Sequence, residues 1–340
     1  MAAFSSEPHI VGSPNEYPLA TPPNDGISDL AFSPLAGSKD LLVSSWDCSV
    51  RLYDVGTSAS QNFQKASYSH TTPVLAAAFV NPARAASGGL DCTLKVYDFD
   101  AMRETVVGTH EKAIRCIGMD SNRGCIVTGS WDSTVKLWDP RSATPADTLV
   151  QPERVYSMAI TGNRLIVGTA GRKVWIWDMR QSSAPEQKRD SSLKFQTRAI
   201  RAFPDGQGFV LSSIEGRVAV EYIQDVDQRR KYAFKCHRAK EGGVEQVHPV
   251  NAIAFHPHYG TFATGGSDAL VNIWDPANKK RLCQFHKYPT SISALSFSAD
   301  GSLLAMAASY QYEFPVDPSP LPKDAVFIRK VTDTETRPKN

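Results

Sequence analysis

Apolar and polar residues alternate in short segments that recur through the chain. The clearest copy covers residues 127–140 and reads V-T-G-S-W-D-S-T-V-K-L-W-D-P. Alternation with a period of two is typical of a strand that buries one face, and the polar W-D-S between the two runs favours a turn. The segment therefore predicts a β-hairpin, which Pro140 ends because proline has no N–H to donate to a neighbouring strand.

The same hairpin returns at intervals of about forty residues. Further copies begin at Val43, Ser87 and Thr264, and weaker copies end at Asp178 and Tyr222. A unit that repeats at this period is the signature of a β-propeller built from WD repeats, in which each repeat supplies a four-stranded blade. The pattern thus predicts an all-β protein.

Seven inner strands can be aligned by an apolar pattern that ends in a bulky residue. They cover residues 27–32, 74–79, 114–119, 155–160, 198–203, 250–255 and 292–297. Each is followed by a turn and a second strand, and then by the hairpin. We therefore expect one closed domain, a seven-bladed WD40 β-propeller over residues 16–331.

The seventh unit is one strand short. Residues 325–331 supply its third strand, and the polar segment that follows, residues 332–340, predicts a C-terminal tail. Closing the ring removes two exposed sheet edges, so a strand near Tyr17 is expected to supply the missing outer strand. Pro18 fits there only on the outermost edge. The preceding residues 1–15 are predicted to form a disordered extension.

Composition excludes only a few classes of function. The chain has 340 residues, 41% of them hydrophobic, and a net charge of +2, so overall charge does not favour nucleic acid or a membrane surface as a partner. It has no signal-like N-terminus and no apolar run long enough to span a membrane. The six cysteines are scattered without a C-x-x-C pair, which is typical of reduced thiols in an intracellular protein. We expect no metal and no cofactor.

Histidine, serine or threonine, and aspartate recur together in three repeats. The sets are His70, Ser87 and Asp91; His110, Thr128 and Asp132; and, more loosely, His248, Thr264 and Asp268. A catalytic triad should occur once, whereas these sets recur with the repeat, so we interpret them as buried hydrogen-bond networks. The sequence also has no phosphate-binding loop and no nucleophile elbow, and we do not expect an enzyme.

Two W-D-x-R runs end in Arg141 and Arg180. Such runs resemble the docking box of substrate receptors for cullin-type ubiquitin ligases. The alternative is that each arginine simply lies on the underside of the propeller after its strand. We favour the alternative, because W-D-x-R is common at this position.

The fifth unit deviates most from the repeat. Its inner strand begins with Arg198 where the other units have Ile or Val, and its hairpin turn carries Arg217. The hairpin ends in Glu221-Tyr222 in place of W-D, and residues 232–238 predict its outer strand. Residues 188–240 hold twelve Lys or Arg against six Asp or Glu, so positive charge gathers in this unit.

In a propeller, the start of an inner strand and the turn after the second strand lie on the same rim. Arg198 and Arg217 are therefore expected to converge on this top face, where Lys235 and Arg238 could join them. Guanidinium groups there are suited to hold carboxylate or phosphate groups through two hydrogen bonds each. The alternative is that the arginines pair with local acids such as Glu215 or Glu221.

Other top-face positions favour a peptide ligand. Trp46 and Trp131 lie in hairpin turns without an evident core role, so they should offer apolar contact. Arg115 and Tyr156 are second in their inner strands and are possible contacts at the mouth of the channel. This mixture indicates an extended acidic or phosphorylated peptide. Nucleic acid fits less well, because the basic residues are confined to one blade and aromatic residues are not interleaved with them.

Several longer segments closely resemble the Bub-three family of mitotic-checkpoint WD-repeat proteins, over residues 22–339. A sister family of mRNA-export propellers at the nuclear pore shares S-S-I-E-G-R-V-A and F-K-C-H-R. The segments that carry the resemblance are P-P-N-D-G-I-S, S-S-W-D-C-S-V-R-L-Y-D-V, G-T-H-E-K-A-I-R-C, G-S-W-D-S-T-V-K-L-W-D-P-R, S-S-I-E-G-R-V-A-V-E-Y, Y-A-F-K-C-H-R and N-K-K-R-L-C-Q-F-H-K-Y-P-T-S-I.

The resemblance implies a non-enzymatic, monomeric adaptor of the spindle assembly checkpoint in the nucleus and at the mitotic kinetochore. Its implied partners are a short acidic motif in the checkpoint kinase Bub-one and its BubR/Mad-type paralogue, the mitotic checkpoint complex, and phosphorylated Met-Glu-Leu-Thr repeats of a kinetochore scaffold. By resemblance, Arg198 and Arg217 would hold the acidic motif, and Trp46, Arg217 and Lys235 would read the phosphothreonine. The alternatives are an mRNA-export adaptor and a ubiquitin-ligase receptor.

Overall fold

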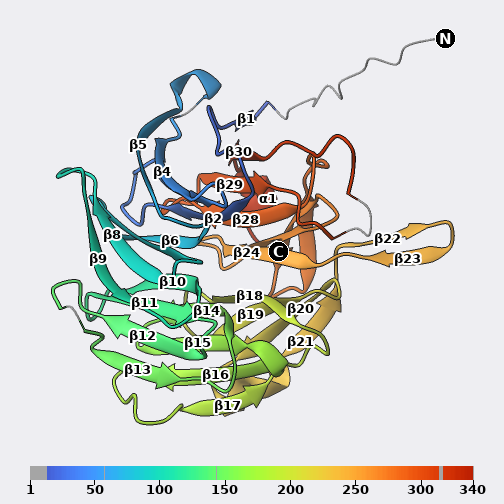
Figure 1. Cartoon of the computed structure of the whole chain (residues 1–340). Coiled ribbons are helices and arrows are strands. Elements are labelled where there is room, and N and C mark those ends of the chain that lie inside the picture. Colours follow the sequence, from blue (N-terminus) through green and yellow to red (C-terminus); the bar gives the residue numbers. More distant parts are fainter. Residues whose placement is uncertain (1–13, 57, 143, 314–316, 340) are drawn as a thin grey trace.

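The computed structural model describes residues 14–56, 58–142, 144–313 and 317–339, and within these ranges the chain forms seven four-stranded antiparallel sheets in a ring (Figure 1). The predicted disordered extension falls mainly on residues 1–13, outside the described residues. This architecture confirms the predicted seven-bladed propeller. No helix in the described ranges is both long enough and apolar enough to cross a membrane.

Each blade runs from an inner strand at the channel to an outer strand at the periphery. The first blade contains β2 (Ile27–Phe32), β3 (Asp40–Ser45), β4 (Ser49–Asp54) and β5 (Phe63–Ser69). The second blade contains β6 (Val74–Asn81), β7 (Arg84–Gly89), β8 (Thr93–Asp98) and β9 (Arg103–Thr109). The third blade contains β10 (Ile114–Asp120), β11 (Cys125–Ser130), β12 (Thr134–Trp138) and β13 (Asp147–Val150). The fourth contains β14 (Val155–Thr161), β15 (Arg164–Thr169), β16 (Lys173–Asp178) and β17 (Gln187–Asp190), and the fifth β18 (Thr197–Ala202), β19 (Gly208–Ser213), β20 (Arg217–Tyr222) and β21 (Tyr232–Lys235). The sixth contains β24 (Val250–Phe255), β25 (Phe262–Gly266), β26 (Val271–Asp275) and β27 (Lys280–Gln284).

Short helical turns connect some of these strands. They are η1 (Ala59–Gln61), η2 (Ala170–Arg172) and η3 (Asp225–Arg230).

The seventh blade closes the ring with strands from both ends of the chain. It contains β28 (Ile292–Phe297), β29 (Leu303–Ala308), β30 (Ala325–Lys330) and, outermost, β1 (Glu16–Pro18). Pro18 pairs with Phe327 on this outermost strand, where the missing proline N–H costs no ladder bond to a further strand. The prediction of an N-terminal closing strand near Tyr17 is therefore confirmed.

Alternation along the strands buries apolar side chains between neighbouring blades. In the third blade, for example, Val127 pairs with Leu137 at full burial, and both pack with Val155 and Val167 of the fourth blade in one core cluster. Since each blade buries its faces against two neighbours, no blade has a complete core of its own.

The inner strands share an irregularity that alternation alone does not predict. In all seven, the pairing with the second strand shifts register directly after the first residue, as between Ile114 and Cys116 or between Val155 and Ser157. Such a β-bulge leaves the next residue outside the ladder and re-aims its side chain. Arg115 and Tyr156 occupy this bulged position.

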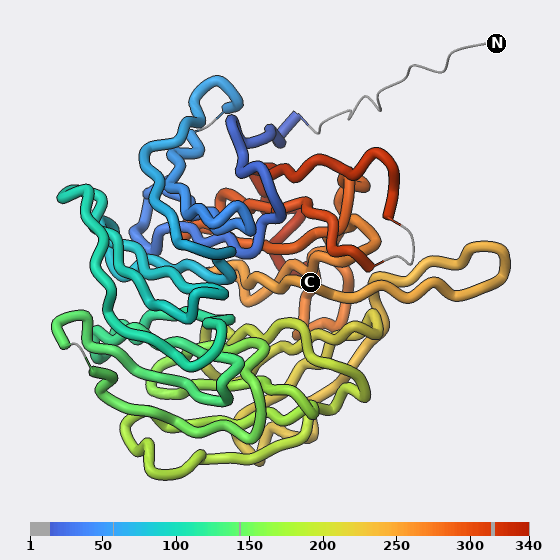
Figure 2. The backbone as a smooth tube through the Cα atoms, viewed as in Figure 1, coloured from blue at the N-terminus to red at the C-terminus, as the bar shows by residue number. Residues whose placement is uncertain are grey.

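The insertion between the fifth and sixth blades differs from the expected single outer strand over residues 232–238. The outer strand β21 ends at Lys235, and the chain continues into a separate hairpin of β22 (Arg238–Glu241) and β23 (Val244–Val247). The left-handed φ of His237, +50°, turns the chain between them. Figure 2 shows this hairpin projecting away from the ring.

The C-terminal segment is more than a polar tail. It contains a short helix, α1 (Asp333–Thr336), whose Thr336 is buried and accepts a 2.7 Å hydrogen bond from the Thr261 hydroxyl at its carbonyl oxygen. The hydroxyl of Tyr259 donates to Asp333 at 2.9 Å. The segment therefore packs against the underside of the sixth blade.

Replacement of Tyr17 tests the contribution of the closing strand to stability. Its ring is buried, and its hydroxyl donates a 2.9 Å hydrogen bond to the carbonyl of Val55. Tyr17→Ala should lower the free energy of unfolding by about 3 kcal/mol, since it leaves a cavity, and Tyr17→Phe by about 1 kcal/mol. Urea unfolding measures both; equal stability of Tyr17→Ala and the unmodified protein would contradict the closing role of β1.

Candidate peptide-binding site on the top face

The top face is the face at which the seven inner strands begin. The turns between second and third strands, the ends of the outer strands and the base of the β22–β23 hairpin lie on the same face, because neighbouring strands are antiparallel. The fifth blade therefore brings the starts of β18 and β20 and the end of β21 to one rim.

A cluster of three cations and two acids occupies this rim, and we call it the blade-five cluster; it consists of Arg217, Lys235, Arg238, Glu215 and Glu245. Arg217 and Lys235 are directly paired across β20 and β21, which places two positive side chains next to each other. Like charges at such positions repel, and acids nearby are needed to offset them.

Two glutamates hold the cations of the blade-five cluster. Arg217 Nε donates to Glu215 at 3.0 Å, and Arg238 donates to Glu245 at 2.8 Å and to the backbone carbonyl of Glu215 at 2.7 Å. Lys235 Nζ lies 3.7 Å from the Glu245 carboxylate. The local acid Glu215 is thus a real partner of Arg217, whereas Glu221 is buried and accepts from the Ser192 hydroxyl instead.

Arg198 lies on the same blade but in a different environment. Its guanidinium donates to the side-chain oxygen of Asn251 at 2.8 and 3.1 Å, and it lies 4.0 Å from the carboxylate of Glu313. Burial lowers the pKa of Arg198, as does nearby Arg115, whereas Glu313 opposes the shift. Arg198 therefore faces the mouth of the channel, while Arg217 belongs to the blade-five cluster at the rim.

The tryptophans predicted to contact a ligand lie on other blades. Trp46 sits in the turn between β3 and β4, is 47% exposed and lies over Gly26. The sixth and seventh blades separate it from the fifth, so it does not share a compact pocket with Arg217 and Lys235. Trp131 lies in the third blade, half-buried, and its indole N–H has no hydrogen-bond partner among the described residues. A ligand that reaches these residues together must extend across the top face.

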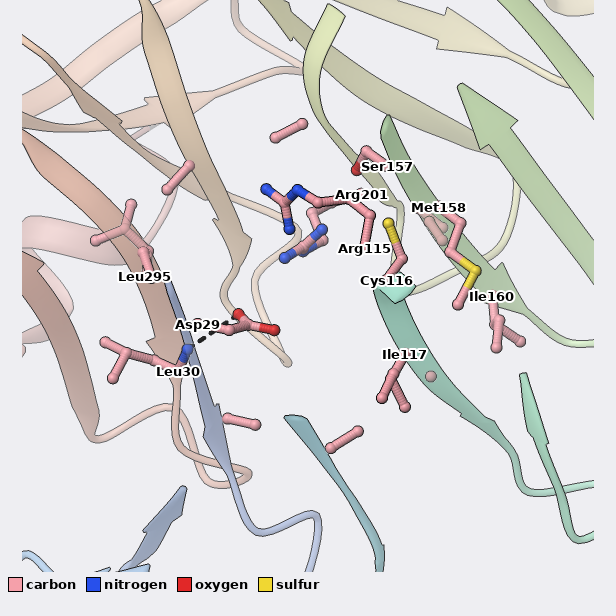
Figure 3. A pocket seen from close by; sticks show the side chains of 18 of the residues that line it. Asp29, Leu30, Arg115, Cys116, Ile117, Ser157, Met158, Ile160, Arg201 and Leu295 are labelled. Atoms are coloured by element: carbon pink, nitrogen blue, oxygen red, sulfur yellow. Dashed lines mark hydrogen bonds between the residues drawn. The ribbon is translucent and has the colours of Figure 1, made fainter. Parts of the chain in front are cut away.

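Arg115 and Tyr156 line the central channel, a cavity of about 510 Å³ enclosed by the inner strands. Figure 3 shows Arg115 directed into this cavity together with Arg201 and, opposite them, Asp29. Sequence reasoning missed Asp29 and Arg201. The sequence feature that could have identified both residues is a charged residue in an inner strand whose other channel-facing positions are small or apolar.

The repeated histidine sets are structural networks. His70 binds Asp91 and Ser87, each at 2.8 Å, and the Tyr68 hydroxyl donates to the same serine. In the third blade, His110 binds Asp132 at 2.8 Å and Thr128 at 2.7 Å. Each set ties the end of one blade's outer strand to the hairpin turn of the next blade.

The prediction for the sixth blade was wrong in one residue. His237, not His248, binds Asp268 and Thr264, each at 2.8 Å. The histidine follows the end of the outer strand in every set, directly for His70 and His110 and after one intervening residue, Cys236, for His237. The β22–β23 hairpin is inserted after His237. His248 therefore takes the expected position of this histidine only if the hairpin is counted as part of the repeat.

The two W-D-x-R arginines lie on the underside. Arg141 binds Asp139 at 2.8 Å and Arg180 binds Asp178 at 2.6 Å, so each pairs with the aspartate of its own W-D. Both side chains are exposed, and their ion pairs keep the pKa of each aspartate at about 2.

Comparison with known proteins now identifies the family. The family described as WD domain, G-beta repeat matches residues 17–54, 103–139 and 239–275. The chain is 53% identical over 328 residues to mitotic checkpoint protein BUB3.1 of Arabidopsis thaliana, with 94% of each chain covered. It is 48% identical over 336 residues to mitotic checkpoint protein bub-3 of Caenorhabditis elegans, covering 97% of this chain and 98% of that protein. The chain belongs to the Bub3 family of mitotic checkpoint proteins.

The Bub3 family has a sister family that is also similar to this chain. The mRNA export factor GLE2 of Chaetomium thermophilum is 41% identical over 304 residues, covering 88% of this chain and 85% of that protein. The predicted resemblance to the Bub3 family, with the export propellers as its sister, is therefore confirmed.

Asp132→Asn tests whether the histidine networks stabilise the blades. Burial opposes ionisation of Asp132, but hydrogen bonds from His110 and Thr134 outweigh it and hold its pKa well below the ordinary 3.8. Because the folded-state pKa is depressed, the ionised carboxylate stabilises the protein above about pH 4, and this stabilisation is lost as pH falls further. The variant should therefore lose about 2 kcal/mol at neutral pH, and less at about pH 3.5.

Urea unfolding at the two pH values measures this difference, with Asp100→Asn in an exposed turn as the control. A loss for Asp132→Asn that is the same at both pH values would show that the carboxylate charge does not matter.

Proposed function

We propose that this Bub3-family protein is a non-enzymatic adaptor of the spindle assembly checkpoint that binds acidic and phosphorylated peptides on its top face. The observation that carries the proposal is the direct cross-strand pairing of Arg217 with Lys235 at a solvent-facing rim, next to Arg238. Three cations at one rim, offset by only two acids, suit a ligand that brings negative charge.

The charge of a phosphate explains how such a ligand would compete with the protein's own acids. Glu215 and Glu245 each supply one negative charge to the blade-five cluster. A phosphothreonine carries a charge of about −1.5 to −2 and three strong acceptor oxygens. It can therefore replace a glutamate at Arg217 and Lys235 and bring more negative charge than the glutamate did. A single peptide carboxylate would only replace one negative charge with another of the same size.

The proposed ligands follow from the family and from this chemistry. We propose the acidic motif of the checkpoint kinase Bub-one and its BubR/Mad-type paralogue, and phosphorylated Met-Glu-Leu-Thr repeats of a kinetochore scaffold. Arg198 at the channel mouth would hold a carboxylate of the acidic motif, and Arg217 with Lys235 the phosphate. Trp46, Trp131 and Tyr156 would then provide apolar contact farther across the face. The protein would act in the nucleus and at the mitotic kinetochore.

The similarity to an mRNA export factor supports a second candidate function, an export adaptor that binds a nuclear-pore partner. Capture of a nuclear-pore protein without any checkpoint kinase would favour it over the checkpoint adaptor. The ubiquitin-receptor alternative has less support, because the pairing of Arg141 and Arg180 with Asp139 and Asp178 already accounts for both arginines.

Titration with a Met-Glu-Leu-Thr peptide, with and without phosphate on the threonine, tests the proposal. We expect the phosphorylated form to bind at least tenfold more tightly, and the preference to weaken as salt rises. Arg217→Ala should weaken binding of the phosphopeptide by about ten- to a hundredfold, as expected for loss of a charged hydrogen bond, and change binding of the unmodified peptide little.

Arg84→Ala is the matched control, since Arg84 is an exposed arginine that pairs with Asp98 on the underside of the second blade. Equal binding of the two peptides, or equal losses for Arg217→Ala and Arg84→Ala, would contradict the proposal.

Glu245→Gln tests whether the acids of the blade-five cluster compete with the ligand. Removing this carboxylate frees Arg238 and Lys235 from an internal ion pair while keeping the side-chain shape. Binding of the phosphopeptide should tighten several-fold, measured by calorimetry. Glu241→Gln, at the exposed tip of the same hairpin, should leave the affinity unchanged; a similar gain in both variants would indicate a nonspecific effect of net charge.

A further inference from the structure

The central channel is lined by more positive than negative side chains. Arg115, Arg198 and Arg201 line it from the third and fifth blades, and Asp29 lines it from the first. The rest of its wall is largely small or apolar, including Ala77, Cys116 and Leu295. Partly buried charges are screened less than charges at the open surface, so the imbalance in the channel matters more than the same imbalance at the surface.

Arg115 has a charge without a close partner. Among the described residues, its guanidinium makes no hydrogen bond and no ion pair within 4.0 Å, although five N–H donors are available. Arg201 uses one donor, in a 2.9 Å hydrogen bond to the backbone carbonyl of Ile200. In Figure 3 both guanidinium groups point into the cavity and toward each other. Two like charges so arranged repel unless an anion lies between them.

Asp29 offsets only part of this charge. Its carboxylate accepts a 2.9 Å hydrogen bond from the backbone of Leu30, and no ion pair within 4.0 Å joins it to either arginine in the described part of the chain. Burial raises the pKa of Asp29, and Arg201 and Arg115 oppose this shift from across the cavity. One carboxylate therefore faces two guanidinium groups.

The wall of the same cavity contains a neutral donor. The Ser293 hydroxyl is buried on the seventh blade and has no hydrogen-bond partner among the described residues. Ser293 and Arg115 occupy the same position of their inner strands, directly after the first residue, where the register shifts. Unpartnered buried polar groups are rare, so the wall of the channel holds one hydrogen-bond donor without an internal partner.

We propose that the central channel binds a small oxyanion of the phosphate class between Arg115 and Arg201. The channel, at about 510 Å³, has ample room for such an ion. Arginine is suited to it because its planar guanidinium donates two parallel hydrogen bonds to an oxyanion. This site is separate from the blade-five cluster, which lies at the rim, and it does not depend on the proposed peptide function.

The site can be tested with inorganic phosphate on the full chain at constant ionic strength set by sodium chloride. Binding to the folded state should raise the midpoint of thermal unfolding, by an amount that grows with the logarithm of phosphate concentration above Kd. Arg115→Gln and Arg201→Gln should each weaken phosphate binding at least tenfold, whereas Asp29→Asn should tighten it several-fold by removing the opposing charge. The opposite signs of these changes distinguish a specific site from general loss of stability.

Two controls make every outcome decisive. Arg84→Ala, which removes an exposed arginine on the underside, should leave phosphate binding unchanged. The channel variants are also measured in an Arg217→Ala background, so phosphate bound at the blade-five cluster does not contribute to the result. Broadening of the phosphorus-31 resonance of phosphate gives a second measurement that does not depend on the stability of a variant. No effect of phosphate on the unmodified protein, or the same effect in the Arg115→Gln/Arg201→Gln double variant, would overturn the channel site.

Discussion

The whole ring depends on a three-residue strand. β1 pairs with β30 through Glu16, Tyr17 and Pro18, and this ladder is what joins the N-terminal end of the ring to its last blade. Without it, β30 would be an exposed sheet edge and the seventh blade would lack its outer strand. Short ladders of this kind are weak alone, so additional contacts must hold β1 in place.

A buried carboxylate supplies those contacts. Glu16 accepts hydrogen bonds from His286 at 2.8 Å and from the Tyr288 hydroxyl at 2.7 Å, and it pairs with Arg329 at 3.2 Å. Arg329 also binds Glu335 of the C-terminal segment at 2.6 Å. A buried charge is tolerated only with such partners, and a chain end that supplies one is fixed in register. The strand β1 and the C-terminal segment are therefore both anchored to the blade that closes the ring.

Closure fixes the seven rims of the top face relative to one another, as the proposed ligand site requires. The second, third and sixth blades use their turns for internal contacts in the histidine networks. The fifth blade differs, since its turn and outer strand place Arg217 and Lys235 side by side. The projecting hairpin then adds Arg238 and Glu245 to the same rim. The proposed ligand site thus arises where the repeat is interrupted.

Much of the fold and of the proposed site could be predicted from the sequence, because strand ends and turns recur with the repeat. The number of blades, the closing strand and the unusual charge of the fifth blade all follow from comparing repeats with one another. The inserted hairpin could not be predicted in this way. It shifts the register when repeats are compared, so the comparison predicts His248 in the position that His237 occupies. Asp29 and Arg201 were missed because the β-bulges change which side chains face the channel.

Cross-linking tests the central claim, that a phosphorylated peptide binds at the rim of the fifth blade, most directly. A phosphothreonine peptide with a photoreactive residue next to the phosphate would be irradiated on the protein, and the linked residues mapped by mass spectrometry. The account predicts links to residues 215–217 and to the β21–β23 region, and their loss when an excess of unlabelled phosphopeptide is added. Links confined to the underside, around Arg141 and Arg180, would contradict it.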